Sequence, residues 1–350
     1  MPNVNRRLSK SAYNLAVVGA TGAVGETFLN ILGERDFPVH TLRLLASERS
    51  KGKIVKCRGK DCEIEVLNEN SFEGIDIAFF SAGASISKQY VEYAIKSGSV
   101  VIDNSSAFRM DENVPLVVPE VNGQDAFKHQ GVIANPNCTT IIMVVALKPL
   151  YDYAKIKKVI VSSYQAASGA GARALDEMLK QVECYVNEKP LEVKYFAHQL
   201  LFNVIPHIDK FMENGYTREE MKMVNETRKI MGDSEMLVSA TCVRVPVETA
   251  HSESVTVEME RPVSVSKARE LFEKAKGITV VDDPANNMYP MPLFTAGKDN
   301  CYVGRIRKDL AFENGITFWV SGDQLRKGAA LNGMQIAELL VGKSSVAAVG

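Results

Sequence analysis

A glycine-rich turn near the start of the chain lies between a strand pattern and a helix pattern. Residues 14–19 (NLAVVG) form a short apolar run, residues 19–25 read GATGAVG, and residues 24–32 repeat apolar side chains at helical spacing. Glycines let a backbone approach a pyrophosphate closely, and the start of the next helix presents free N–H groups to the anion. The glycines stand in the strand–turn–helix context that such a site requires, so the turn predicts dinucleotide binding.

The segment after this turn alternates between short apolar strands and helices. Residues 42–46, 75–80 and 100–103 are apolar runs, and residues 87–97 have an amphipathic helical pattern. Strands that are apolar throughout are typical of a parallel sheet covered by helices on both faces. The sequence therefore predicts an α/β fold that begins with a Rossmann-type, doubly wound dinucleotide-binding domain.

The pattern changes near residue 135, where longer strands with alternating polarity begin. Strands are expected at 158–164, 235–247, 252–260, 302–308 and 316–321, and helices at 139–151, 171–186, 217–230 and 266–276. Alternation of apolar and polar residues indicates a sheet packed on one face only. We predict an α+β catalytic and dimerisation domain with a mixed or antiparallel sheet, whose free face or edge could serve for dimerisation.

The length of 350 residues suits two domains, because domains usually contain roughly 100–200 residues. We expect the dinucleotide-binding domain at residues 1–138, completed by a C-terminal segment at 328–350 whose helix spans residues 328–341. The catalytic and dimerisation domain is then expected at residues 139–327.

Composition argues against several classes of protein. Lysine plus arginine number 41 against 42 acidic residues, so a net charge of −1 leaves no basic footprint for nucleic acid or an anionic membrane. The six cysteines include no CxxC pair, which argues against a disulfide scaffold and against a zinc site, so no metal is expected. Residues 141–147 are too short an apolar run to cross a bilayer, and the N-terminus has no separate signal-peptide core. We expect a reduced, cytoplasmic protein.

The choice between NAD and NADP has two opposing signals. Glu48 stands near the position where an acidic residue binds the ribose hydroxyls of NAD. The surrounding residues 47–51 (SERSK) also offer a guanidinium, two hydroxyls and an ammonium group, which suit a 2′-phosphate. A solvated charge cluster at a strand end is a third interpretation, and these residue types alone leave all three open.

Cys138 stands at the start of a predicted helix, with Asn137 before it as a plausible N-cap. In the first turn of a helix the dipole favours thiolate over thiol, which makes the sulfur a better nucleophile. The same backbone N–H groups can hold an oxyanion on an acyl group attached to that sulfur. A lone cysteine is more often a small core residue, so position by itself leaves both interpretations open.

His251 is the candidate base, because it lies between two strand patterns, where side chains often line a cleft. An unbroken strand would put Arg244 and His251 on opposite faces, since they are an odd number of residues apart. Pro246 indicates that the strand does not run unbroken. A hydrogen-bonded loop histidine without a catalytic role is the alternative.

Segments along nearly the whole chain resemble the aspartate-β-semialdehyde dehydrogenases of the bacterial type. They are GATGAVG (19–25), LASERSKGK (45–53), NSSAFRMD (104–111), VVPEVN (117–122), NPNCTT (135–140), SYQAASGAGARAL (163–175), EEMKMVNETRKI (219–230), RVPVETAHSE (244–253) and LRKGAALNGMQIAE (325–338). Each combines specific polar and small residues rather than a hydrophobic pattern. Residues 1–12 match nothing in the family and are expected to form a mobile tail.

The resemblance implies an NADPH-dependent reductive dephosphorylation of L-aspartyl-4-phosphate to L-aspartate-4-semialdehyde. This reaction belongs to lysine, threonine, methionine and diaminopimelate biosynthesis. Cys138 resembles the nucleophile that forms a thioacyl-enzyme, His251 the general acid/base, and Gln165 the residue that orients the intermediate. A homodimer is also implied by the resemblance.

The remaining matches imply the binding sites. Arg244 resembles the clamp of the substrate carboxylate, for which a planar guanidinium is apt. Glu219 resembles the partner of the substrate amino group, although Glu219 and Lys222 could also be a simple helical i,i+3 pair. Arg109, Lys222 and, less directly, Asn104 resemble the phosphate site. The residues that resemble NADP contacts are Gly19, Thr21, Gly22, Ala23, Val24, Gly25, Ser47, Arg49, Ser50, Ser81, Gly83, Ser168, Gly169 and Asn332.

Two alternative functions are open at this point. One is another acyl-phosphate reductase, such as an N-acetyl-γ-glutamyl-phosphate reductase, which uses the same cysteine and histidine chemistry. Glu219 discriminates against it, because only the aspartyl substrate has a free amino group. The other is a non-catalytic NADP-binding relative, which would bind cofactor without turnover.

Overall fold

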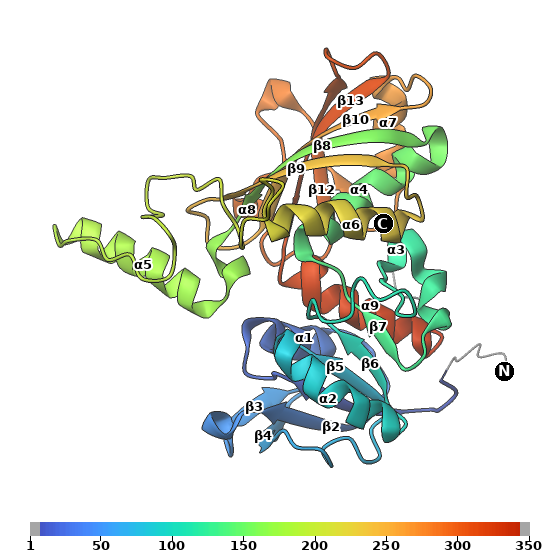
Figure 1. Ribbon diagram of the computed structural model, residues 1–350, viewed down its shortest axis with the longest axis vertical. Coiled ribbons are helices and arrows are strands. Elements are labelled where there is room, and N and C mark those ends of the chain that lie inside the picture. The colour runs from blue at the N-terminus through green and yellow to red at the C-terminus, as the bar shows by residue number, and fades with distance from the viewer. Residues whose placement is uncertain (1–7, 344–350) are drawn as a thin grey trace. The chain divides into compact units, whose positions relative to one another are not determined.

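The computed structural model describes residues 8–343, which form two compact units (Figure 1). Among these residues, 8–137 and 328–343 make up the first unit, and 138–327 the second. Residues 1–7 of the predicted tail and 344–350 of the predicted C-terminal segment lie outside the described part of the chain.

The first unit is built on a seven-stranded sheet in the order β3-β4-β2-β1-β5-β6-β7. All pairings are parallel except the β3–β4 hairpin at one edge. Strands β2, β3 and β4 lie on one side of β1, and strands β5, β6 and β7 lie on the other, so the strand order reverses beside β1. The strands are β1 (Tyr13–Val18), β2 (Val39–Ala46), β3 (Ile54–Cys57), β4 (Lys60–Val66), β5 (Ile77–Phe80), β6 (Val100–Asp103) and β7 (Val132–Ala134).

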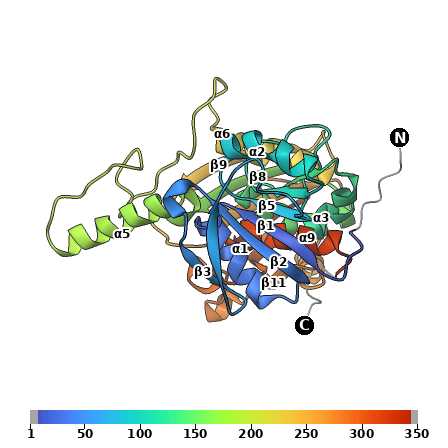
Figure 2. The same cartoon turned by 90° about the horizontal axis from the view of Figure 1, so that it is seen from below.

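Helices cover both faces of this sheet. Helices α1 (Ala23–Glu34) and α9 (Leu331–Leu340) share a hydrophobic cluster with Phe79, whereas α2 (Ala84–Lys96) packs in a second cluster with Phe80. Neighbouring strand residues fall into opposite clusters because their side chains alternate between faces. Figure 2 shows α2 across the sheet from α1. The predicted Rossmann-type fold is confirmed. The short elements of this unit are η1 (Glu48–Ser50), α3 (Pro119–Asn122) and η2 (Gly123–Lys128).

The N-terminal segment contradicts part of the predicted tail. The N–H of Leu8 donates to the carbonyl oxygen of Leu340 at 2.9 Å, and Lys10 Nζ pairs with Asp76 at 2.6 Å. The phenol of Tyr13, itself buried, donates to the carbonyl oxygen of Leu8. Residues 8–12 are therefore attached to the core, and the prediction of a mobile tail is wrong for them. Sequence patterns do not report such backbone contacts.

The C-terminal helix begins differently from the prediction. Residues 326–330 form a π-helical turn, and the α-helix α9 begins only at Leu331. Hydrophobic periodicity does not distinguish such a wider turn from an α-helical one, so the predicted start at residue 328 was too early.

The second unit contains a six-stranded mixed sheet in the order β11-β12-β13-β10-β8-β9. The β8–β9 and β11–β12 pairs are parallel, and the other pairs are antiparallel. The predicted second-domain sheet is thus confirmed as mixed. Strand β11 of this sheet and strand β7 of the first unit have three residues each and were not predicted, because such short runs show no hydrophobic periodicity. The strands are β8 (Ile156–Gln165), β9 (Leu237–Arg244), β10 (His251–Met259), β11 (Ile278–Val280), β12 (Cys301–Lys308) and β13 (Gly315–Gly322).

One face of this sheet is covered by helices α4 (Cys138–Ala154), α6 (Arg218–Met231) and α7 (Val265–Glu273) (Figure 1). Along β8, Val161 and Ser163 on that face are buried, whereas Ile160 on the other face is 49% exposed. The alternation of burial along β8 follows the alternation of polarity in its sequence. The short elements of this unit are η3 (Ala167–Ala170), η4 (Pro284–Asn286) and α8 (Pro292–Thr295).

Helix α5 (Ala172–Val186) projects away from the six-stranded sheet (Figures 1 and 2). Its Met178 packs with Ala167, Leu200 and Ile205 in a small hydrophobic cluster. Another group of large apolar side chains on this helix is exposed, namely Leu179, Val182, Tyr185 and Val186. Helix α5 therefore buries one side against its own unit and leaves an apolar side uncovered in the single chain.

None of the helices within residues 8–343 has the length and apolar composition needed to cross a membrane. All six cysteines lie in this part of the chain, and no disulfide joins any of them.

Candidate active site

The β1–α1 turn of the first unit passes very close to the backbone that follows β5. Gly19 has a φ of +85°, and a Cβ atom there would lie 2.5 Å from the carbonyl oxygen of Ser81. At Gly25 a Cβ atom would lie 2.2 Å from the carbonyl oxygen of Gly19. Only glycine fits both positions without displacing backbone. The turn therefore has the shape that a dinucleotide pyrophosphate requires.

The predicted cofactor residues of this unit, except Asn332, gather where β1, β2 and β5 end. In doubly wound sheets, ligands bind at the carboxyl ends of the strands where the strand order reverses. The hydroxyl of Thr21 lies 3.4 Å from that of Ser50 in η1, which links two of these strand ends. Glu48 pairs with Lys51 at 3.4 Å, and this pair is exposed. The residues at these strand ends are Gly19, Thr21, Gly22, Ala23, Val24, Gly25, Ser47, Arg49, Ser50, Ser81 and Gly83.

Arg109 is buried in the first unit and oriented by backbone carbonyls. Its Nε donates to the carbonyl oxygen of Asn135 at 3.0 Å, and its Nη2 donates to that of Asn104 at 3.1 Å. The side-chain amide of Asn135 donates to Asn104 Oδ1 at 2.7 Å and accepts from Asn332 at 2.7 Å. Three predicted site residues, Asn104, Arg109 and Asn332, thus belong to one hydrogen-bond network. Asn135 connects them and was not predicted as a site residue.

In the second unit, three strands bring predicted residues to one edge of the sheet. The parallel strands β8 and β9 end at Gln165 and Arg244, which are directly paired in register. Strand β10 is antiparallel to β8 and begins at His251. The carboxyl ends of β8 and β9 therefore meet the start of β10. The break near Pro246 lets Arg244 and His251 lie at the same edge, as the proline suggested.

Cys138 is the first residue of helix α4, so Asn137 occupies the preceding position. The thiol is half-buried, and its Sγ lies 3.8 Å from the hydroxyl of Thr139. A negative charge on Cys138 interacts favourably with the guanidinium of Arg244. The helix start and this cation both favour the thiolate.

His251 is fully buried, and its ring is held by the backbone beside it. Its Nδ1 accepts the N–H of Ala166 at 3.0 Å. Burial, and then the positive charge of Arg244, hold the pKa of His251 well below its usual value. The neutral ring accepts at Nδ1, so it carries its proton on Nε2. Within residues 8–343, Nε2 has no hydrogen-bond partner.

The loop before His251 is strained and fixed by a residue that sequence reasoning missed. Ala250 has a φ of +75°, a conformation that non-glycine residues rarely adopt. Gln324 accepts the N–H of Ala250 at 2.8 Å and donates to the hydroxyl of Ser168 at 2.7 Å. At Gly169 a Cβ atom would lie 2.7 Å from Cε1 of His251, so the ring packs directly on this glycine. No spacing or motif in the sequence connects Gln324 with the loop.

Arg244 is buried and held by the same backbone residue as His251. Its Nη1 donates to the carbonyl oxygen of Ala166 at 2.6 Å. Burial lowers the pKa of Arg244 from its usual value, and the charges of Glu219 and Cys138 oppose this shift. Ala166 therefore positions a cation through its carbonyl oxygen and an imidazole through its N–H.

Helix α6 supplies the acidic side of the site. Thr217 and Glu220 form a capping box, so the helix begins at Arg218 and places Glu219 in its first turn. The Nε2 of Gln165 donates to Glu219 Oε1 at 3.4 Å. Glu219 is buried, so this cap brings a carboxylate into the interior beside the end of β8.

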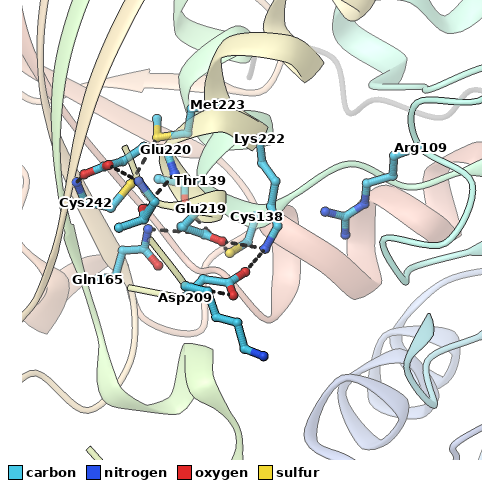
Figure 3. Close-up of polar contacts among 12 residues, drawn as sticks. Arg109, Cys138, Thr139, Gln165, Asp209, Glu219, Glu220, Lys222, Met223 and Cys242 are labelled. Carbon is cyan, nitrogen blue, oxygen red and sulfur yellow. Dashed lines mark hydrogen bonds and ion pairs between the residues drawn. The ribbon is translucent and has the colours of Figure 1, made fainter. Parts of the chain in front are cut away.

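Lys222 is bound by two carboxylates in the structure. Its Nζ lies 2.9 Å from Glu219 and 3.0 Å from Asp209 (Figure 3). Burial lowers the pKa of Lys222, but these ion pairs outweigh burial and raise the pKa above its usual value. The expected i,i+3 pair between Glu219 and Lys222 is present, and both residues also belong to the larger cluster with Gln165. Asp209 was not predicted, because it lies in a loop without a recognisable motif.

The second unit thus brings together Cys138, Gln165, Glu219, Lys222, Arg244 and His251, with Ser168 and Gly169 beside the histidine loop. The other predicted residues, including Arg109, Asn104 and Asn332, belong to the first unit.

Two family models match the chain and together cover most of it. Residues 14–129 match the NAD binding domain of semialdehyde dehydrogenases, and residues 147–327 match their dimerisation domain. These matches, together with the dinucleotide-binding fold and the cluster of Cys138 and His251, identify the chain as a member of the semialdehyde dehydrogenases.

Individual relatives narrow this class. The aspartate-semialdehyde dehydrogenase of Aquifex aeolicus is 57% identical over 333 residues, covering 94% of this chain and 98% of that protein. A crystal structure of aspartate semialdehyde dehydrogenase II from Vibrio cholerae, complexed with ASA, is 46% identical with a TM-score of 0.92, covering 95% of this chain and 99% of that one. The chain belongs to the aspartate-semialdehyde dehydrogenase family.

A more distant structure contains a cofactor. The Candida albicans aspartate semialdehyde dehydrogenase, solved with NADP, is 26% identical with a TM-score of 0.76 and covers 94% of this chain and 98% of that one. The three proteins compared above are all named aspartate-semialdehyde dehydrogenases, so none of them supports the alternative of an N-acetyl-γ-glutamyl-phosphate reductase.

Proposed function

We propose that this protein is an aspartate-semialdehyde dehydrogenase that reduces L-aspartyl-4-phosphate to L-aspartate-4-semialdehyde and releases phosphate. The observation that carries the proposal is the cluster in the second unit, where a helix-start cysteine, a buried histidine and a buried arginine meet. Family membership supports the same reaction. In the cell this activity would serve lysine, threonine, methionine and diaminopimelate synthesis in the cytoplasm.

Cys138 is the nucleophile in this proposal. Its thiolate attacks the acyl phosphate, phosphate leaves, and the acyl group is held as a thioester. The N–H groups at the start of α4 stabilise the oxyanion that forms during attack. A reduced dinucleotide, when bound, would supply the hydride for reduction of the thioester, and Cys138 would leave as the thiolate when the aldehyde forms. Gln165, fixed beside Glu219, orients the acyl group.

His251 serves as the general acid/base. In the observed geometry its Nε2–H is a donor, which suits hydrogen bonding to the oxygen that becomes negative in the tetrahedral intermediates. Removing the proton from the Cys138 thiol requires the other tautomer, which gives up the hydrogen bond from Ala166.

Each charged residue of the cluster binds a different group of the substrate. Arg244 holds the α-carboxylate through its planar guanidinium, and Glu219 accepts the amino group. Lys222 keeps a third N–H beyond its two ion pairs, which suits a phosphate oxygen. Arg109 and Asn104 are the phosphate-binding residues proposed for the first unit. Two cations suit a phosphate that must be held and then leave as a dianion.

The reverse reaction tests the proposal directly. We expect phosphate-dependent reduction of NADP by L-aspartate-4-semialdehyde, with at least about a 10³-fold loss in the Cys138→Ala variant. Cys184→Ala is the matched control, because this half-buried cysteine lies on α5 and outside the cluster. Folded protein that binds NADP but does not turn over would overturn the proposal and favour the non-catalytic alternative.

NADP is the cofactor in this proposal. The glycine positions leave room for a pyrophosphate, and the exposed Arg49 at the end of β2 offers a cation for the 2′-phosphate. Replacing Arg49 with alanine should raise the KM for NADP about 10–100-fold and leave the KM for NAD unchanged. Equal KM effects on both cofactors would refute the role of Arg49.

A second copy of this chain is the proposed partner of the apolar side of α5. The family model that covers this helix is described as a dimerisation domain, and the side chains are exposed in the single chain. A charge at Val182, which is 40% exposed, should convert the homodimer into monomers in sedimentation experiments. Ile54→Glu, at an exposed apolar residue of β3, is the control and should leave the dimer intact.

A further inference from the structure

A second row of buried polar residues lies directly behind the strand ends of the candidate site. Two residues back from Gln165, Ser163 pairs in register with Cys242 of β9 on one side and with Glu253 of β10 on the other. All three side chains are buried. One further step along the strands, the corresponding residues are apolar: Val161, Ala240 and Val255. On this face of the sheet, the polar residues of these three strands are therefore confined to the strand ends, where Gln165 lies, and to the row that contains Ser163.

Glu253 is the unusual member of this second row. It is fully buried, and within residues 8–343 neither of its carboxyl oxygens has a hydrogen-bond partner. Burial raises the pKa of Glu253 well above its usual value, which favours the neutral acid, a form with one O–H donor. A buried polar group without a partner is costly, and none of the roles assigned so far uses this one.

Ser163 has one acceptor position left for that donor. A hydroxyl has one hydrogen and two lone pairs. Gln165 Nε2 donates to Ser163 Oγ at 3.2 Å, which occupies one of the two lone pairs of this hydroxyl. Glu253 lies directly opposite Ser163, and Cβ atoms of such cross-strand pairs are only about 4.5–5.5 Å apart. The remaining lone pair of Ser163 and the O–H of Glu253 are thus chemically complementary groups on directly paired residues, although no hydrogen bond joins them in the described residues.

The orientation of the Gln165 amide depends on this serine. The Nε2 of Gln165 donates to Ser163 and to Glu219, and a carboxylate can only accept, so the amide nitrogen must face these two groups. If Ser163 turns, one of the two contacts that fix the amide is lost.

We propose that Glu253 is a positioning residue for the reaction: its carboxylic acid donates to Ser163, through one bridging water or after a rotation of the Glu253 side chain, and so holds the Gln165 amide in place. This inference rests on the proposed function, in which Gln165 orients the acyl group on Cys138. The three residues form a chain from the sheet interior to the strand end. Glu253 itself touches no reacting atom.

Kinetics of paired variants test the chain. Glu253→Leu, of similar volume, should lower kcat about 10–100-fold while the KM for phosphate stays within about twofold. Glu253→Gln keeps a donor in a neutral side chain and should restore kcat to within about threefold of the wild type. Ser163→Ala should resemble Glu253→Leu, and the double variant should be no worse than either single variant, because one chain is broken in each case. Ser162→Ala, at the neighbouring residue on the opposite face, is the control.

Three results would overturn the inference. They are wild-type kcat in Glu253→Leu, an equal loss in Glu253→Gln, and losses that multiply in the double variant. Should Glu253→Leu fail to fold, Ser163→Ala and the rescue by glutamine still decide the question.

Wild-type turnover separates this inference from the proposed function. An inactive wild type refutes the function. In that case crystal structures of the wild type and Ser163→Ala still test the chain. A Glu253 carboxyl hydrogen-bonded to Ser163, directly or through an ordered water, in the wild type, with a rotated Gln165 amide in the variant, supports it. A wild-type structure in which neither a direct bond nor a bridging water joins the two side chains refutes it.

Discussion

The backbone N–H of Ala166 donates a 3.0 Å hydrogen bond to Nδ1 of His251. The carbonyl oxygen of the same residue accepts a 2.6 Å hydrogen bond from Nη1 of Arg244. One peptide residue after β8 therefore fixes both the tautomer of the histidine and the position of the arginine. A protonated imidazole has no lone pair at Nδ1, so this arrangement, with burial and the nearby cation, keeps the ring neutral.

The neutral histidine makes the stability of the protein depend on pH. The pKa of His251 is well below its usual value in the folded protein, so below about pH 6.5 the unfolded chain binds a proton that the folded protein does not. Stability must then fall as the pH drops from about 6.5 toward the folded pKa, by up to about 1.4 kcal/mol per pH unit. Urea unfolding between pH 5 and 7.5 should show a steeper decline for the wild type than for His251→Asn. Parallel curves would contradict a neutral buried histidine.

Arg244→Lys should impair substrate binding. Lysine keeps the positive charge but loses the planar pair of donors that matches a carboxylate. We expect the KM for aspartate semialdehyde to rise about 10–100-fold, measured in the phosphate-dependent reverse reaction. Arg307→Lys, at an exposed position of β12, is the matched control. An unchanged KM in Arg244→Lys would assign the carboxylate to another group.

Glu219→Gln should distinguish the aspartyl substrate from an N-acylated one. The substitution removes the negative charge that would pair with a free amino group and leaves the helix cap at Thr217 and Glu220 intact. The KM for aspartate semialdehyde should rise about 10–100-fold. Glu220 supports the cap and is unsuitable as a control, so Glu235→Gln in an exposed turn serves instead. If both variants behave alike, Glu219 does not recognise the amino group.

Two glycines in the first unit should respond oppositely to alanine. At Gly19, alanine meets both a φ of +85° and the carbonyl oxygen of Ser81 at 2.5 Å, so we expect a loss of about 1–3 kcal/mol and weaker NADP binding. At Gly33, inside α1 with no atom within 4 Å of a new Cβ, alanine should stabilise the helix by about 0.5–1 kcal/mol. Chemical denaturation and a cofactor titration of each variant test this. Equal effects would mean that the turn relaxes around a side chain.

Much of the fold was predictable because local sequence carries its signals. The continuous apolar runs of β1 and β5 and the glycine turn between strand and helix specify a doubly wound unit. The alternating polarity of β8 and β10 specifies a sheet packed mainly on one face. Cys138 at a helix start was predictable for the same reason, since caps and helix starts depend on neighbouring residues.

The partners of the site residues were not predictable in this way. Gln324 lies 156 residues along the chain from Ser168, and Asp209 lies 13 residues before Lys222 in a loop, and neither stands in a motif. Leu8 looked like part of a tail, and its backbone bond to Leu340 depends on a helix more than 300 residues away. Such contacts follow from how elements pack and leave no local pattern.

The amino-acid sequence alone determined the strand and helix types, the nucleotide turn, and the residues whose chemistry suits acyl transfer. Tertiary structure decided which of these residues act together. The register of β8, β9 and β10 places Gln165 beside Arg244 and puts Glu253 opposite Ser163. It also buries His251 and Glu253, and burial lowers the pKa of the histidine and raises that of the glutamate, which favours the neutral form of each. The physical reason is that side-chain types and short-range periodicity are local properties, whereas proximity and desolvation arise only when distant strands pair and helices cover them.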